Sequence, residues 1–172
     1  MNEAFLSYLW KFRLYKNEKL QTTEGEAIEV LQTGEQNHQS GPDFFNAKIK
    51  IGDTIWAGNV EIHTSASDWL KHQHQTDDAY DNVILHLVYE PDTAIKRKDG
   101  TPIPTLSLLK RIPPMMYQNF LYLDSSKDWI PCQEQITQID NFTISTWLDR
   151  LLIERLERKI TPILQALQDN QN

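Results

Sequence analysis

Residues 41–86 contain the side chains best suited to chemistry. All but one of the five histidines fall there, and Asp43 and Glu61 stand among apolar residues that alternate as in β-strands. Buried polar groups cost free energy unless they find partners, so acids and imidazoles beside a packed sheet point to a functional site. Glu61 and His63 are two residues apart on a predicted strand, so they face the same way, about 7 Å apart, close enough to share one ligand.

The histidines suggest zinc as one hypothesis. A zinc-dependent hydrolase or a structural zinc site needs imidazoles and an acid, which His63, His72, His74 or His86 could supply together with a carboxylate. Two features count against joint ligation. His72 and His74 are two residues apart and diverge on an ideal helix. His86 lies inside an apolar run, which is typical of a hydrogen-bonded core histidine.

The elements that must position these residues follow from hydrophobic periodicity. The order helix, strand, strand, strand, helix, strand predicts an α/β (α+β) fold with a mixed sheet and an αβββαβ core, followed by a C-terminal helical extension. The predicted helices span 3–15, 68–75, 115–123 and 145–167, and the predicted strands span 26–31, 44–51, 54–63, 83–89 and 103–109. We expect a core domain over 1–113 and a helical extension over 114–172. The apolar stripe of the last helix predicts packing on a partner or on the rest of a longer chain.

Two sets of residues resemble known families. Pro42-Asp43 followed by Glu61-Ile62-His63 resembles the Pro-Asp…Glu-x-Lys motif of the restriction-endonuclease-like nucleases, a superfamily with the same αβββαβ order over roughly residues 3–89. A longer set resembles an uncharacterised bacterial family, a domain of unknown function whose members are longer than this chain. It comprises Gly41-Pro42-Asp43-Phe44, Gly58-Asn59-Val60-Glu61-Ile62-His63, Ser67-Asp68-Trp69 and His72-Gln73-His74.

The nuclease resemblance implies a metal-dependent phosphodiesterase. A metal polarises the phosphate and lowers the pKa of the attacking water. Mg²⁺ accepts one or two carboxylates, so Asp43 and Glu61 would bind Mg²⁺ or Mn²⁺. His63 stands where those nucleases have lysine, and an imidazole can act as general base near neutral pH.

The register of the hairpin decides whether the two acids meet. With a strict two-residue turn at Gly52-Asp53, Asp43 faces away from Glu61, whereas a bulge or a longer turn restores it. Lys48 and Lys50 share the face of Glu61 under the strict register and leave it under the shifted one. Under either register, therefore, Asp43 and these lysines are not expected to lie together on the face of Glu61.

Composition limits the partners. A net charge of -7 and a pI near 5.2 disfavour broad nucleic-acid binding, although Lys48, Lys50 and the loop Lys96-Arg97-Lys98 could contact phosphate. The mean hydropathy of -0.54 and the lack of a long apolar run predict no membrane span. One cysteine and no secretory signal favour the cytoplasm.

Three functions remain open at this point. The first is a nuclease-like enzyme that uses Asp43, Glu61 and His63, and the second is the zinc hydrolase or structural zinc site. The third is a catalytically inactive, nuclease-derived interaction module that acts through its long C-terminal helix.

Overall fold

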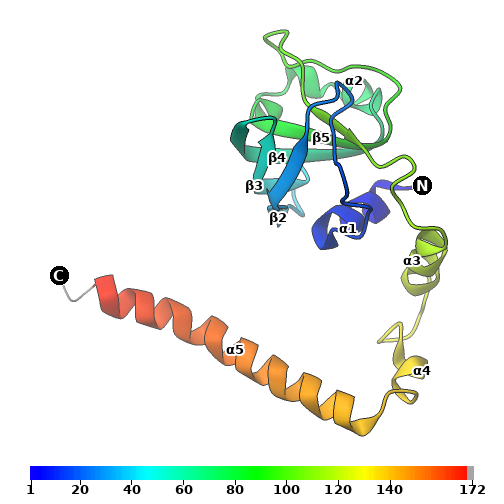
Figure 1. Cartoon of the computed structure of the whole chain (residues 1–172), viewed down its shortest axis with the longest axis vertical. Helices are drawn as coiled ribbons and strands as arrows, with labels where there is room; N and C mark the ends of the chain where they lie inside the picture. The colour runs from blue at the N-terminus through cyan, green and yellow to red at the C-terminus, as the bar shows by residue number, and fades with distance from the viewer. Residues whose placement is uncertain (170–172) are drawn as a thin grey trace. The chain divides into compact units, whose positions relative to one another are not determined.

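The structure is a computed structural model, and it describes residues 1–169 (Figure 1). It divides into two compact units, one of residues Met1–Leu121 and one that begins at Tyr122. The first unit contains the sheet and every residue of the candidate site. That residues 114–172 form a separate domain stays a prediction.

The first unit is built on a mixed six-stranded sheet, which confirms the predicted fold class. The strands follow the order β1-β3-β4-β5-β6, and β2 pairs with β3. Pairs β1/β3 and β3/β4 are antiparallel, whereas β4/β5 and β5/β6 are parallel. The strands are β1 (Ile28–Gln32), β2 (Glu35–Gln36), β3 (Phe44–Ile51), β4 (Thr54–Ser65), β5 (Val83–Glu90) and β6 (Thr105–Ser107).

Helix α1 (Glu3–Phe12) covers one face of this sheet. The side chain of Asn2 caps it by accepting a hydrogen bond from the backbone of Phe5, and the left-handed conformation of Arg13 ends it, earlier than the predicted end at residue 15. Four of its apolar side chains are fully buried with Val60 and Ile62 of β4 in the main core, namely Phe5, Leu6, Leu9 and Trp10. The hydrophobic residues of β4 therefore point to α1, and Glu61 and His63 point to the other face.

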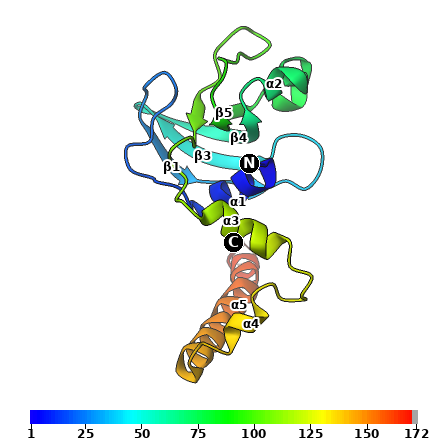
Figure 2. The same ribbon diagram turned by 90° about the vertical axis from the view of Figure 1, so that its right-hand side faces the viewer.

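The other face carries the crossover between the parallel strands β4 and β5 (Figure 2). It consists of α2 (Asp68–Lys71) and two short 3₁₀ helices, η1 (His74–Thr76) and η2 (Asp78–Tyr80). Trp69 and Tyr80 from this segment form a second, smaller apolar cluster with Val83, Ile95 and Ile103. The predicted helix 68–75 is too long, because α2 ends at Lys71.

The remaining helices are α3 (Met116–Asp124), α4 (Gln133–Ile136) and α5 (Asn141–Asp169). Tyr117 and Phe120 of α3 contact the ring of Phe5 at centroid distances of 4.9 and 5.0 Å. Helix α5 runs through Pro162 as one element. No helix among the described residues is both long and apolar enough to cross a membrane.

Candidate metal centre

A β-bulge in β3 brings Asp43 to the face of Glu61. Ala47 pairs with Gly58, but Phe44 pairs with Val60, so three steps along β3 match two along β4. Asn46 lies inside this bulge with a φ of 56°, a left-handed conformation that asparagine tolerates better than most residues. The bulge that the sequence left open is thus present, and Asp43 comes to lie opposite Glu61.

The two acids are joined by reciprocal hydrogen bonds to the backbone. The N–H of Asp43 donates to Glu61 Oε2 at 3.1 Å, and the N–H of Ile62 donates to Asp43 Oδ2 at 2.9 Å. Each carboxylate is therefore held by the strand that carries the other. This fixes one oxygen of each acid and leaves Glu61 Oε1 to face the histidines.

The predicted phosphate contacts are not gathered with this pair. Lys48 pairs with Ala57, four residues before Glu61, which places its Cα about 13 Å away along the strand. Both Lys48 and Lys50 lie between the turn and the bulge, so they keep the register that puts them on the face of Glu61, but at the far end of the hairpin. This corrects the expectation that Asp43 and these lysines cannot share that face, because the bulge shifts only Asp43.

The loop Lys96-Arg97-Lys98 has its own partners. The guanidinium of Arg97 donates to the carbonyl oxygens of Val83 and Pro102, and Lys98 forms an ion pair with Asp78 at 2.8 Å. Lys96 is bridged to Pro102. This loop is therefore tied to the start of β5 and to η2, and its contact with phosphate stays a prediction.

Three histidines converge next to Glu61. His63 Nε2 lies 3.1 Å from His72 Nδ1, and His63, His72 and His74 each offer one ring nitrogen within 4.8 Å of the others. Glu61 Oε1 is 3.5 Å from His63 Nε2 and 3.4 Å from His74 Nε2. Ligand atoms around a tetrahedral ion with bonds of about 2.0–2.1 Å are about 3.3–3.4 Å apart, so these separations suit a shared metal ion.

The convergence of His72 and His74 corrects the prediction that they diverge. Their ring centroids are 5.4 Å apart, because the helix does not continue through them. His72 caps the C-terminus of α2, Gln73 adopts a left-handed conformation with φ of 62°, and His74 starts η1. The reversal at Gln73 turns both rings toward His63.

His86 supports the cluster from beneath. It is fully buried on β5 and pairs in register with Glu61. A hydrogen bond of 2.8 Å joins His86 Nε2 to His63 Nδ1, which confirms the expected hydrogen-bonded core histidine. If His63 Nε2 binds a metal, His63 Nδ1 must carry the proton and donate it to His86, since neutral imidazole has one donor and one acceptor.

Aromatic rings close the inner wall. The ring of Tyr80 stacks on His74 with centroids 3.7 Å apart, and Trp69 meets His74 edge-on at 5.3 Å. The side chain of His74 is 10% exposed, and its Nε2 has no hydrogen-bond partner among the described residues. His72, by contrast, is exposed. The centre is thus dry on the side of η1 and η2 and open to solvent at His72.

Burial makes charged side chains unfavourable at this site. Burial and the nearby Glu61 carboxylate raise the pKa of Asp43 to about 7, and burial raises the pKa of Glu61 to about 8. Burial and the neighbouring His74 lower the pKa of His63 to about 3. Burial also lowers the pKa of His74, and it lowers that of His86 well below its usual value.

These shifts describe neutral imidazoles facing acids that lack a counter-charge. Neutral imidazole is the form that binds a metal, and a cation would restore the ionised form of both acids. Glu3, at the start of α1, contributes to these shifts, because its charge also raises the pKa of Asp43 and of Glu61. The sequence gives no sign of this role, because nothing in the pattern of α1 distinguishes Glu3 from an ordinary acid in the first turn of a helix.

Comparison with known proteins shows the family. A family model described as "Protein of unknown function (DUF2851)" matches residues 3–172. The chain belongs to this family. The membership confirms the resemblance to an uncharacterised domain and extends it over both units, but the DUF2851 description assigns no reaction. No curated protein and no solved structure matches the chain.

Proposed function

We propose that this chain is a metal-dependent hydrolase in which His63, His72 and His74 hold a transition-metal ion such as zinc. One observation carries the proposal: three ring nitrogens lie within 4.8 Å of one another, with Glu61 Oε1 beside two of the rings. Imidazoles suit zinc and related ions better than Mg²⁺, which prefers oxygen ligands.

The reaction we propose is attack by a metal-activated water. An ion held by three protein ligands keeps a position for water and lowers the pKa of that water toward neutrality. Glu61 is placed to accept the proton of that water, since its Oε1 faces the histidines while its Oε2 is held by the N–H of Asp43. The exposed side of His72 is the entrance for substrate.

Metal content and hydrolysis together test this function. Protein purified without added metal is analysed for bound ions, then assayed with bis(p-nitrophenyl) phosphate and p-nitrophenyl acetate before and after chelation. We expect about one equivalent of zinc and metal-restored hydrolysis. His72→Ala and His74→Ala should lose metal, whereas His38→Ala, the histidine outside the cluster, should not. Full zinc binding without hydrolysis of either ester would leave a structural metal site and exclude the hydrolase.

A second candidate is the nuclease-like enzyme with Mg²⁺ or Mn²⁺ at Asp43 and Glu61 and His63 in the place of lysine. It is supported by the bulge that aligns the two acids and by the αβββαβ order of α1, β1, β3, β4, α2 and β5. Under this alternative, Asp43→Asn abolishes Mn²⁺-dependent cleavage of DNA or RNA and leaves zinc binding intact. Equal background cleavage by wild type and Asp43→Asn would exclude it.

A further inference from the structure

The first half of β4, Thr54–Gly58, has an unpaired edge. This edge is on the side of β4 that pairs with β5 from Asn59 onward. Parallel pairing with β5 begins only at Asn59, which matches Val83, so within the described residues no strand pairs with Thr54–Gly58 on that side. Because Gly52-Asp53 makes a two-residue turn, Ile51 and Thr54 form the first hydrogen-bonded pair of the hairpin. The alternation then turns the backbone N–H and C=O of Ile55 and Ala57 away from β3.

A hydrogen bond of Asn59 confirms that the backbone groups of this alternation point away from β3. Asn59 follows Ala57 by two residues, and its N–H donates to the carbonyl oxygen of Asn82, at the entrance to β5. Ile55 and Ala57 therefore present their backbone groups along the same line, before β5 begins. Unpaired strand edges of this kind accept an added strand from another segment.

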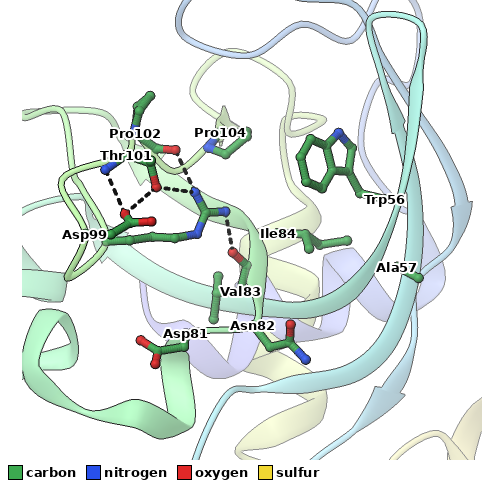
Figure 3. Close-up of a pocket in the computed structure, with 11 residues that line it drawn as sticks. Trp56, Ala57, Asp81, Asn82, Val83, Ile84, Asp99, Thr101, Pro102 and Pro104 are labelled. Carbon is green, nitrogen blue, oxygen red and sulfur yellow. Dashed lines mark hydrogen bonds between the residues drawn. The ribbon is translucent and has the colours of Figure 1, made fainter.

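A hollow of about 570 Å³ lies beside this free edge (Figure 3). The indole of Trp56, which is 45% exposed, points toward Ile84 and Pro104 and forms an apolar wall. Gly58 closes the end of the edge, because a Cβ there would lie 2.6 Å from the carbonyl oxygen of Asn82. The hollow is thus formed by the packing of β4 against the start of β5, at the place where the two strands begin to pair.

The polar part of the lining favours a basic occupant. Asp81 and Asp99 are exposed carboxylates on the lining. Among the described residues of the lining, Arg97 is the one cation, and it donates to the carbonyl oxygens of Val83 and Pro102 and to the hydroxyl of Thr101. Both terminal nitrogens of Arg97 therefore donate to the protein itself. Asp99 Oδ1 accepts from the N–H and the hydroxyl of Thr101, whereas the carboxylate of Asp81 accepts no hydrogen bond from the described residues. The net charge of -7 of the whole chain acts in the same direction.

We propose that the edge of β4 at Thr54–Gly58 binds an extended basic peptide segment by strand addition. The backbone of Ile55 and Ala57 pairs with the added strand, an apolar side chain packs on Trp56, and a lysine or arginine faces Asp81 and Asp99. The site lies about five residues along β4 from Glu61, about 17 Å, so it is separate from the metal centre and independent of the proposed hydrolysis.

Peptide binding to the full chain tests the proposal. The probe is a fluorescein-labelled seven-residue peptide of alternating valine and lysine, measured by fluorescence polarisation against the same peptide with glutamate in place of lysine. We expect the valine-lysine peptide to bind at least tenfold more tightly, and its binding to weaken with salt. Equal binding of the two peptides, or no binding of either, would overturn the proposal.

Matched variants separate strand addition from other contacts. Ala57→Pro removes the outward N–H and should weaken binding at least tenfold, whereas Ala57→Ser keeps that N–H and should bind as wild type. Asp81→Asn with Asp99→Asn should weaken binding about fivefold, whereas Asp53→Asn in the turn should not. Circular dichroism verifies the fold of each variant.

Two further readouts are independent of affinity. The amides of Ile55 and Ala57 should gain protection from hydrogen exchange when the valine-lysine peptide binds. If Ala57→Pro leaves peptide binding unchanged, or if these amides gain none, the edge is not the site. If sedimentation shows a dimer that Ala57→Pro dissociates, a second copy of this chain occupies the edge and the peptide proposal fails.

Discussion

His86 is placed to position His63 within the candidate metal centre. Its Nε2 lies 2.8 Å from His63 Nδ1, at the base of the cluster and out of contact with solvent. As an acceptor, it keeps the proton of His63 on Nδ1 and leaves Nε2 free for a metal. Partners of this kind orient metal-binding histidines and increase their basicity.

Replacing His86 should therefore weaken metal binding. We expect His86→Leu, which removes the acceptor, to lower zinc affinity about 10- to 100-fold, as measured by competition with a chromophoric chelator. His86→Gln keeps an acceptor oxygen and should retain most of the affinity. If His86→Leu binds zinc as tightly as the wild type, His86 does not position His63.

The elements around the site show what the sequence could and could not predict. The periodicity of β4 placed Glu61 and His63 on one face, and the apolar run of β5 placed His86 in the core, because burial on a strand follows alternation. The bulge at Asn46 could only be named as an alternative, since Phe44-Phe45-Asn46-Ala47 is compatible with either register. The convergence of His72 and His74 could not be predicted, because it depends on the left-handed backbone conformation of Gln73. A glutamine in the sequence does not indicate that conformation.

The bulge can be tested through the backbone of Asn46. A β-branched residue is strained at a φ of 56°, so Asn46→Val should lower the free energy of unfolding by about 1–2 kcal/mol. Asn46→Gly should change it by only a few tenths, because glycine adopts this conformation freely. Urea unfolding measures both. Unchanged stability of Asn46→Val would mean that the bulge is not fixed by this residue.

At the scale of the whole molecule, the site makes the stability of the metal-free protein depend on pH. Asp43 and Glu61 have pKa values raised to about 7 and about 8, so the folded state holds protons that the unfolded state has already released. Stability therefore falls as the pH rises through this range. The histidines act in the opposite direction: their pKa values are lowered on folding, so stability falls as the pH drops below about 6.5.

Above pH 6.5 the two acids outweigh the histidines, which are half protonated in the unfolded state at that pH. We expect the free energy of unfolding of the metal-free protein to fall by about 1 kcal/mol between pH 6.5 and pH 8, as measured by urea unfolding. The double variant Asp43→Asn with Glu61→Gln should not show this fall. A rise in the stability of the wild type over this range would contradict the burial of these acids without a cation.

The second unit adds apolar surface to the molecule. Along α5, Leu148, Leu152 and Leu156 are each about half exposed, at 61%, 57% and 49%. That this helix packs on a partner or on the rest of a longer chain stays a prediction. The candidate metal centre, in contrast, lies wholly within the first unit, so its metal binding can be measured without reference to α5.

The most direct measurement is the zinc affinity of the metal-free full chain at pH 7.5, by chelator competition, for the wild type, His74→Ala and His38→Ala. We predict one tight site in the wild type and in His38→Ala, and a loss of at least 100-fold in His74→Ala. Zinc binding that is absent in the wild type, or equal in all three proteins, would contradict a metal centre at His63, His72 and His74.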